Sequence, residues 1–179
     1  WCTYDIPALI FRPFNNYGPQ QHLEKCIPRF ISSAIKDEPL TIHGDGSQER
    51  DWVHTLEVAR ALDLAFHIED FESIKNQVIH IGSGIPVSIL DIAKMILKYF
   101  NLPEEKYLKF IGDRPGQVQR HISSTQKAKA LLGWQNEINF EEGLHSVIEW
   151  YIHNRHRWEK NEPLMLIPIY TNNNTIEVH

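Results

Sequence analysis

Short apolar runs alternate with longer segments of helical periodicity along most of this chain. The short runs, which are typical of buried strands, are residues 8–11, 40–43 and 78–81. The longer segments, in which apolar residues recur every three or four positions, are 27–36, 55–66, 88–100, 124–132 and 140–158. Strands that alternate with helices predict an α/β fold with a parallel sheet.

Single residues predict the ends of two helices, and apolar spacing predicts the buried face of one. Thr55 can cap the helix that follows it, and Gly133 is expected to end the helix at 124–132, because glycine adopts the left-handed backbone of a C-cap. The predicted buried face of the helix 55–66 consists of apolar residues at helical spacing: Leu56, Ala59, Leu62, Ala65 and Phe66. For residues 161–179 a packed extension, an edge strand and a frayed tail all stay open.

Three turn-forming clusters, each after an apolar run, carry amide or guanidinium groups. They are Arg-Pro-Phe-Asn-Asn-Tyr-Gly-Pro at 12–19, Gly-Asp-Gly-Ser-Gln-Glu-Arg-Asp-Trp at 44–52 and Asp-Arg-Pro-Gly at 113–116. Loops at strand ends are where α/β proteins place their ligand contacts. The planar guanidinium donates two parallel hydrogen bonds to an anion, so these clusters predict a phosphorylated small molecule as the ligand.

Composition and charge argue against several classes of protein. With 42% hydrophobic and 23% charged residues, the 179-residue chain is expected to fold as a globular protein. Its net charge of −5 offers no basic surface for nucleic acid or an anionic membrane. No apolar run reaches the roughly 18 residues of a membrane span. Cys2 and Cys26 form no metal-binding or disulfide pattern, so the expected compartment is the cytoplasm, and no metal site is predicted.

Six motifs occur together in the order and spacing of a known family. Besides the clusters at 12–19 and 113–116, they are Glu-Lys-Cys-Ile-Pro at 24–28, Pro-Leu-Thr-Ile-His-Gly-Asp-Gly at 39–46, Arg-Asp-Trp at 50–52, and Leu-Gly-Trp at 132–134 with Glu-Trp-Tyr at 149–151. On these motifs the chain resembles the C-terminal half of the extended short-chain dehydrogenase/reductases that act on nucleotide sugars. Within that superfamily it is most similar to the dTDP-glucose 4,6-dehydratases.

The resemblance implies the C-terminal part of an extended Rossmann-type, doubly wound α/β fold with the substrate-binding subdomain. Residues 1–160 would form this nucleotide-sugar-binding half, and residues 161–179 would be a tail of unknown role. The N-terminal dinucleotide-binding part would be missing, since no glycine-rich phosphate loop occurs near the start of this sequence. NAD, the cofactor of the family, would be bound mainly by that missing part. The full-length protein would be a homodimer.

The resemblance also assigns roles to the first motifs. Asn15 would hold the diphosphate or sugar of the substrate, and Asn16 would lie towards the nicotinamide of NAD. Lys25 and Cys26 match the substrate-binding pair that follows the Asn-Asn turn, where the family often has leucine at the second position. The alternative for Asn15 and Asn16 is a role as turn formers only, since asparagine tolerates a left-handed backbone.

Thr41, Ile42 and His43 match the positions at which the family holds the nucleobase. A base could stack on the imidazole or lie against Ile42. The alternative for His43 is an ordinary surface histidine. Because Thr41 and His43 differ from the commonest dehydratase residues, the preferred base and sugar stay open.

Arg50 and Arg114 match the two arginines that grip the diphosphate, and Gln117 lies where the closest relatives often carry histidine. The alternative for Arg50 is a structural ion pair with Asp51 or Glu57. Trp52 is expected in the core rather than at the ligand.

The implied function is the nucleotide-sugar-binding portion of an NAD-dependent 4,6-dehydratase that makes a 4-keto-6-deoxy sugar nucleotide. The catalytic Tyr-x-x-x-Lys pair and acidic pair of the family would lie before Trp1, so no catalytic residue is expected in this stretch, and it should be inactive by itself. One alternative is a nucleotide-sugar 4-epimerase or decarboxylase. Another is a non-catalytic module that binds nucleotide sugars without a cofactor.

Overall fold

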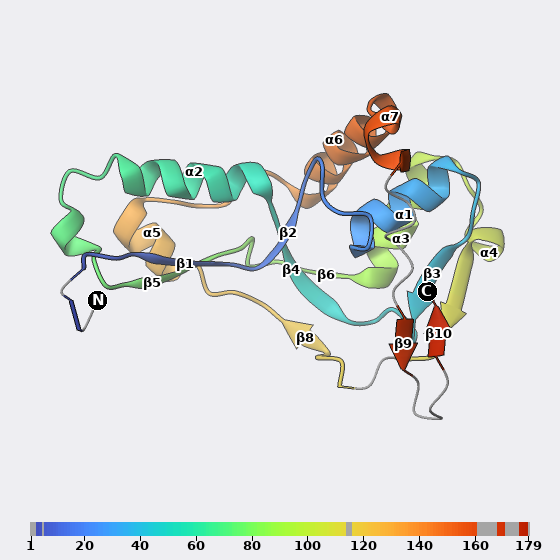
Figure 1. The fold of residues 1–179 in the computed structure, drawn as a ribbon, viewed down its shortest axis with the longest axis horizontal. Helices are drawn as coiled ribbons and strands as arrows, with labels where there is room; N and C mark the ends of the chain where they lie inside the picture. Colours follow the sequence, from blue (N-terminus) through green and yellow to red (C-terminus); the bar gives the residue numbers. More distant parts are fainter. Residues whose placement is uncertain (1–2, 5, 114–115, 161–167, 171–175, 179) are drawn as a thin grey trace. The chain divides into compact units, whose positions relative to one another are not determined.

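Two compact units make up the chain in the computed structural model (Figure 1). The structure describes residues 3–4, 6–113, 116–160, 168–170 and 176–178. Unit 1 comprises residues 1–18, 47–88 and 115–143, and unit 2 comprises residues 19–46, 89–114 and 144–179. Both units combine strands with helices, as the predicted α/β class requires.

Unit 1 contains two small sheets. In one, β1 (Ile10–Pro13) pairs in parallel with β5 (Val78–Ile81). The other has the strand order β2-β4-β6, with β8 also paired to β4. Its strands are β2 (Asn15–Tyr17), β4 (Glu49–His54), β6 (Pro86–Ser88) and β8 (Arg120–His121). In this second sheet β2 and β8 run parallel to β4, whereas β6 is antiparallel to it.

The first sheet of unit 1 is buried unevenly. Ile79 and Ile81 of β5 are fully buried, but Ile10 of β1 is 37% exposed. Each strand of a two-stranded sheet is an edge strand, and β5 is the one pairing partner of β1 among the described residues. The prediction that 8–11 is a buried strand is therefore right about a parallel strand, which begins at Ile10, but wrong about burial, because none of residues 8–11 is fully buried.

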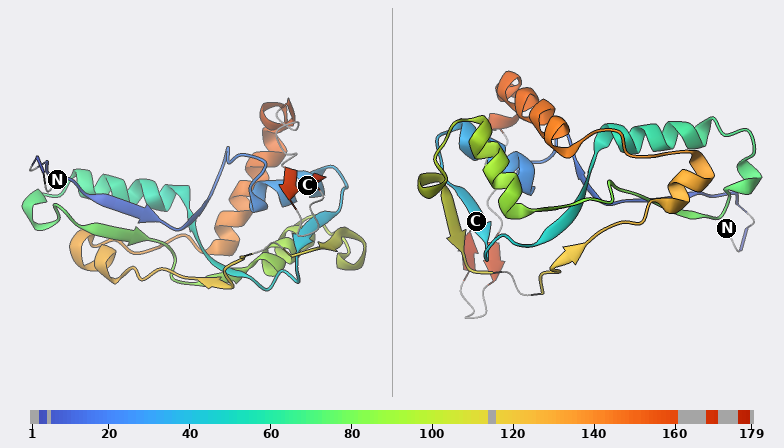
Figure 2. Two further views of the ribbon diagram at one scale, coloured as in Figure 1. Left: turned by 60° about the horizontal axis from the view of Figure 1, so that its bottom comes forward. Right: turned by 180° about the vertical axis from the view of Figure 1, so that it is seen from behind.

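The helical elements of unit 1 are α2 (Thr55–Phe66), the short 3₁₀ helix η1 (Phe71–Ser73) and α5 (Gln126–Leu132). Figure 2 shows α2 and α5 next to the β1–β5 pair. Residues of these elements share one apolar core: Val53, Ala61, Ile74, Ile79, Ile81, Ala128, Leu132 and Trp134. Gly133 follows α5 with φ +65°, which confirms the predicted C-cap.

The buried face of α2 differs from the predicted one. The fully or nearly fully buried residues of the helix are Glu57 and Ala61, whereas Leu56, Leu62 and Phe66 are 63%, 41% and 86% exposed. Helical periodicity predicts a face correctly only when the buried positions are apolar. At Glu57 a carboxylate occupies the buried position, so the apolar stripe identifies the wrong side of the helix.

Unit 2 packs several helices with a short sheet. Its elements up to residue 111 are α1 (Cys26–Ile35), β3 (Leu40–His43), α3 (Ile89–Tyr99), α4 (Glu104–Tyr107) and β7 (Leu108–Ile111). β3 and β7 are parallel, and α1 packs against α3 and β3. Apolar residues on one side of each helix are fully buried, among them Ile27 and Ile31 on α1 and Ile92 and Ile96 on α3. The predicted elements at 27–36, 40–43 and 88–100 are confirmed within one or two residues.

The predicted helix at 140–158 is two helices. α6 (Phe140–His153), whose first turn belongs to unit 1, ends before Asn154, and α7 (Arg155–Trp158) follows. The Asn154 side chain donates to the carbonyl of Trp150 at 2.9 Å, which is one way in which asparagine interrupts a helix. In the expected tail, β9 (Pro168–Tyr170) and β10 (Ile176–Val178) form an antiparallel pair. The rest of 161–179 lies outside the described residues.

Candidate functional site

Asn15, Asn16 and Arg50 lie on paired strands, not on turns. Asn15 stands opposite Trp52 and Asn16 opposite Val53 in the parallel β2–β4 pair. Neither asparagine has a left-handed backbone, so the interpretation of the pair as turn formers is wrong. The prediction that Arg50 lies in a turn is wrong as well, since β4 already begins at Glu49. The signal for β4 was the Trp-Val pair, two residues that favour strands.

Arg50 pairs with neither carboxylate that the sequence offered as a structural partner. Its Nη1 donates to the carbonyl oxygen of Glu49 at 2.8 Å, and the structure gives it no ion pair within the described ranges. Asp51 and Glu57 are fully buried and bind other groups. The guanidinium is half-buried, and most of its donors are available to an anion.

Asp51, the residue after Arg50 on β4, is the centre of a hydrogen-bond cluster. Its Oδ1 accepts from the backbone N–H and the hydroxyl of Ser83, at 2.6 and 2.7 Å. Its Oδ2 accepts from the N–H of Gly84 at 3.1 Å and from the N–H and hydroxyl of Ser123. A Cβ at Gly82 would lie 2.6 Å from Asp51 Oδ2, so a side chain there would displace the Asp51 carboxylate from its hydrogen-bond donors. One buried carboxylate thus ties β4 to two other segments of unit 1.

Glu57 makes a second carboxylate cluster at the start of α2. Its Oε1 accepts from the backbone N–H of Glu137 and Ile138, both at 2.7 Å, and its Oε2 accepts from Nη2 of Arg60 at 2.6 Å. The carbonyl of the same residue accepts from the Trp134 indole N–H at 3.1 Å. These bonds hold the segment after α5 against α2.

The end of β4 carries a buried histidine beside a buried tyrosine. His54, not Thr55 as predicted, caps α2: its Nδ1 accepts from the N–H of Leu56 at 3.2 Å. The Tyr17 ring stands edge-on to the imidazole, with the ring centroids 5.2 Å apart. Burial lowers the pKa of His54, and the nearby Glu57 carboxylate opposes that shift. Burial, reinforced by Glu57, raises the pKa of Tyr17. Both side chains are therefore neutral at neutral pH.

Gln117 belongs to the segment that leads into β8, close to the start of β4. This segment follows β4 in parallel, with Glu49 opposite Arg120 and Arg50 opposite His121, and Glu49 N–H donates to the Gln119 carbonyl at 2.8 Å. Unit 1 thus places Asn15, Asn16 and Arg50 on one small sheet, and Gln117 in the segment that leads into its strand β8. Trp52, in the same sheet, is buried and donates from its indole to the Val87 carbonyl, so its predicted core role is confirmed.

Two histidines near this sheet were missed in the sequence. The Phe14 ring centroid lies 5.6 Å from that of His80 on β5 and 4.8 Å from that of His121 on β8. Arg12 lies opposite His80 in the β1–β5 register. The available signal was a polar residue inside the otherwise apolar run 78–81.

In unit 2, β3 presents alternate residues of the predicted nucleobase segment. Ile42 is fully buried, so the expectation that a base lies against its side chain is wrong. Thr41 and His43 point to the other face and are half-buried. The His43 Nδ1 lies 3.2 Å from the carbonyl oxygen of Gly112, which fixes the ring beside the segment after β7.

Lys25 and Cys26 lie at the N-terminus of α1. Lys25 is the N-cap residue, and Cys26 opens the helix and is half-buried. The Lys25 ammonium is 2.9 Å from Glu24 Oε1, and this ammonium lowers the pKa of Glu24. A helix N-terminus attracts anions, because its first N–H groups have no partners within the helix. β3, which carries His43, packs against α1.

Arg114, the second predicted diphosphate ligand, lies outside the described residues.

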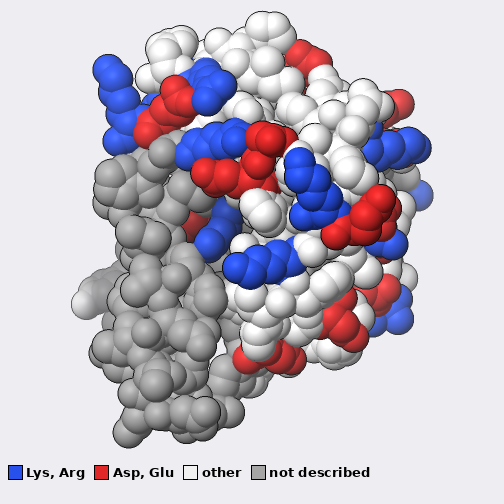
Figure 3. All heavy atoms as spheres, turned by 90° about the vertical axis from the view of Figure 1, so that its right-hand side faces the viewer, with Lys and Arg blue, Asp and Glu red and all other residues white. Residues whose placement is uncertain are grey.

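The described residues contain no group of three or more His, Cys, Asp or Glu side chains arranged to hold a metal ion. None of the helices in the described ranges is long and apolar enough to cross a membrane. On the face drawn in Figure 3, acidic side chains are interspersed among the basic ones, so the charge there is mixed.

Comparisons with known proteins agree with the sequence motifs. The family model described as GDP-mannose 4,6 dehydratase matches residues 1–147. The low-salt glycan biosynthesis protein Agl12 of Haloferax volcanii is 39% identical over 150 residues, which cover 84% of this chain and 46% of that protein. The dTDP-glucose 4,6-dehydratase of Haemophilus influenzae is 34% identical, with 85% and 47% covered. The chain therefore spans about half the length of these relatives.

Solved structures give the same family likeness. DesIV, a dTDP-glucose 4,6-dehydratase of Streptomyces venezuelae crystallised with NAD and TYD, superimposes with a TM-score of 0.81 at 30% identity, covering 89% of this chain and 48% of that one. The UDP-glucuronic acid 4-epimerase of Bacillus cereus, in complex with UDP-glucuronic acid and NAD, gives a TM-score of 0.78 at 30% identity, with 85% and 47% covered. Dehydratases and an epimerase share this architecture.

Proposed function

Because this chain belongs to the GDP-mannose 4,6 dehydratase family, we propose that it is the nucleotide-sugar-binding part of an NAD-dependent 4,6-dehydratase. The product of that enzyme would be a 4-keto-6-deoxy sugar nucleotide. The names of the relatives support this reaction, since several are dTDP-glucose 4,6-dehydratases. The related 4-epimerase is the reason to keep epimerisation as the second candidate.

The observation that carries the proposal is that Arg50 forms no ion pair with a carboxylate among the described residues. Its guanidinium has no carboxylate partner in the described part of the chain, although Asp51 is its neighbour in sequence. A cation held near other hydrogen-bonding groups and left without a counter-ion suits a diphosphate. Asn15 on the same sheet as Arg50 and Gln117 in the segment before β8 would bind the remaining diphosphate or sugar oxygens.

The residues of unit 2 would contribute separately. The Lys25 ammonium and the first N–H groups of α1 suit phosphate oxygens. Thr41 and His43, on the half-buried face of β3, suit the nucleobase, the hydroxyl by hydrogen bonding and the imidazole by stacking. Arg114 is included from the sequence motif alone.

The residues of this chain fit only one end of NAD. The half-buried Asn16 carboxamide on β2 suits the nicotinamide side, but the sequence offers no glycine-rich turn for the pyrophosphate of a dinucleotide. When bound, NAD would supply hydride acceptance and return at the sugar. The proposed part of this chain is to bind and orient the sugar nucleotide. A homodimer of the full-length protein and a cytoplasmic location belong to the same proposal.

Two experiments test the function. Calorimetry on this chain with dTDP-glucose, UDP-glucose and NAD separately should show nucleotide-sugar binding and little NAD binding. Incubation of the natural protein that carries this sequence with NAD and each sugar nucleotide should then release one water and give a 4-keto-6-deoxy product. A product of unchanged mass and inverted C4 would favour the epimerase, and tight NAD binding to this chain alone would contradict the assignment of NAD to other residues.

A further inference from the structure

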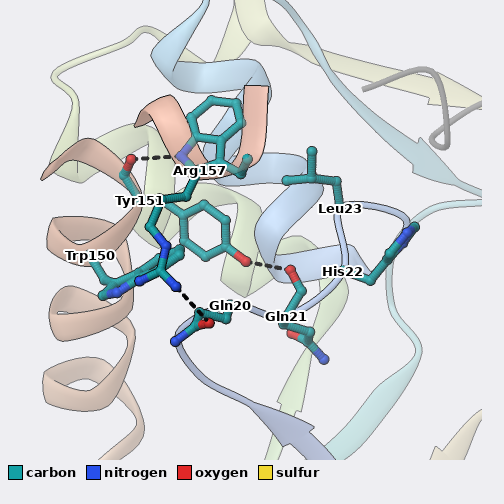
Figure 4. A pocket seen from close by; sticks show the side chains of 8 residues that line it. Gln20, Gln21, His22, Leu23, Trp150, Tyr151 and Arg157 are labelled. Atoms are coloured by element: carbon teal, nitrogen blue, oxygen red, sulfur yellow. Dashed lines mark hydrogen bonds between the residues drawn. The ribbon is translucent and has the colours of Figure 1, made fainter. Parts of the chain in front are cut away.

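A cavity in unit 2 is lined by none of the residues proposed to bind the nucleotide sugar. It has a volume of about 230 Å³ and lies between α6, α7 and the segment before α1 (Figure 4). Its lining residues are Gln20, Gln21, His22, Leu23, Trp150, Tyr151, Arg157 and Trp158. We propose that this cavity binds a small organic anion, a carboxylate or phosphate carried on a flat apolar body.

Three aromatic side chains make the apolar wall. Tyr151 and Trp158 are buried, and the Trp150 and Tyr151 ring centroids are 5.0 Å apart, nearly perpendicular to each other. Two polar atoms of this wall, the Tyr151 hydroxyl and the Trp158 indole N–H, already have partners. The Tyr151 hydroxyl donates to the Gln21 carbonyl at 2.6 Å, and the Trp158 indole donates to the Tyr151 carbonyl at 2.8 Å. Tyr151 and Trp158 therefore offer a ligand their rings rather than hydrogen bonds.

Arg157 supplies the charge at the mouth of the cavity. Its guanidinium carbon lies 5.8 Å from the centre of the Trp150 ring, and its Nη2 donates to Gln20 Oε1 at 3.3 Å (Figure 4). A neutral amide at 3.3 Å is a weak partner for a cation that has five donors. The neighbouring Arg155 is neutralised by Glu159, whereas the structure pairs Arg157 with no carboxylate within the described residues. An anion can therefore replace the Gln20 amide and make stronger, charge-assisted bonds.

The size of the cavity sets the size of the ligand. A volume of 230 Å³ corresponds to roughly eight water molecules at about 30 Å³ each. Pockets for drug-sized ligands begin at about 300 Å³, so a whole nucleotide sugar would not fit. One ring with one acidic group fills the space: the ring would lie against the aromatic wall, and the acid would face Arg157.

Saturation-transfer NMR on the 179-residue chain tests the proposal with benzoate, phenyl phosphate and inorganic phosphate, and with benzyl alcohol as a neutral control. Benzoate or phenyl phosphate should bind at least about tenfold more tightly than benzyl alcohol, because only the anions form charge-assisted hydrogen bonds with Arg157. The stronger of the two identifies the acid as carboxylate or phosphate. Inorganic phosphate should bind more weakly than phenyl phosphate, because it leaves the aromatic wall uncovered. Equal affinity for benzoate, phenyl phosphate and benzyl alcohol would overturn the proposal.

Two arginine variants separate this cavity from general surface charge. Arg157→Gln should weaken binding of the preferred anion by about tenfold or more, whereas Arg155→Gln, an equal change of charge on the same helix, should leave it within about twofold. Amide resonances should shift at residues 20–23 and 150–158. Saturating dTDP-glucose should not displace the anion. Displacement, or equal loss in both variants, would contradict a separate site.

Discussion

The two units are stabilised by different chemistry. Unit 1 buries Gln48, Asp51, His54 and Glu57, whereas Ser32 is the buried polar side chain of unit 2 among the described residues. The clusters around Asp51 and Glu57 join segments 32 to 81 residues apart in sequence. In unit 2 the same task falls to apolar packing between α1, α3 and β3.

The difference shows how a sheet of short strands can be stabilised by buried carboxylates instead of by large apolar side chains. The strands of the β2-β4-β6 sheet are three to six residues long, too short to bury much apolar surface. A carboxylate that accepts several backbone N–H bonds fixes loop and strand together, and it positions the neighbouring Arg50. The cost is that such a cluster fails when one member is lost.

Replacement of the Asp51 carboxylate should have the largest effect. Asp51→Ala leaves the donors of Ser83, Gly84 and Ser123 buried without an acceptor, so we expect a loss of about 4 kcal/mol in the free energy of unfolding. Urea denaturation measures it. Asp63→Ala, an exposed carboxylate on α2, is the control and should change stability by less than about 0.5 kcal/mol. A loss below about 1 kcal/mol for Asp51→Ala would refute the claim that the Asp51 carboxylate holds these segments together.

The apolar packing of unit 2 is tested on β3. Ile42→Ala should cost about 2–4 kcal/mol, because it leaves a cavity in a packed core, while His43→Ala should cost little. The same denaturation assay compares the two. Similar losses for both would mean that the inward and outward residues of β3 are assigned incorrectly.

The role of Arg50 is tested by ligand affinity rather than stability. Arg50→Ala should weaken nucleotide-diphosphate binding by about 1.5–3 kcal/mol, and Arg50→Lys should recover only part of it, because charge survives without the planar fork. Arg114→Ala should weaken nucleotide-diphosphate binding by a similar amount. Calorimetry with dTDP-glucose provides the measurement, and Arg155→Ala serves as the control. Unchanged affinity in the Arg50 variants would assign the residue a structural role.

The buried imidazole of His54 makes unit 1 sensitive to acid. Because its pKa is lowered in the folded state, the unfolded chain binds a proton near the ordinary pKa of 6.5 before the folded chain does. Stability from this group is complete above about pH 6.5 and is lost as the pH falls below it, by less than about 1.4 kcal/mol per pH unit. Denaturation at about pH 7.5 and about pH 5.5 should show a smaller difference in His54→Asn, which keeps a capping side chain. An equal difference would contradict this account.

The smallest effect should come from the exposed side of α2. Phe66→Ser should change stability by less than about 0.5 kcal/mol, since Phe66 is 86% exposed. The matched change at a buried core ring of the same unit, Trp134→Ser, should cost at least about 3 kcal/mol. If urea denaturation showed a large loss of stability for Phe66→Ser, the face predicted from periodicity would be the buried one after all.

The sequence by itself determined the α/β class, the elements at 27–36, 40–43, 78–81 and 124–132, and the family. These depend on local signals, such as apolar periodicity, the Gly133 C-cap and motifs that keep their order along the chain.

Only the tertiary structure decided the strands β2 and β4, the buried face of α2 and the partners of Asp51 and Glu57. Each depends on residues far apart in sequence: β4 is a strand because β2, β6 and β8 pair with it, and Glu57 can be buried because the segment after α5 supplies its donors. Local propensity is weak in such places, since hydrogen bonds to distant segments outweigh the few tenths of a kcal/mol per residue that propensity contributes.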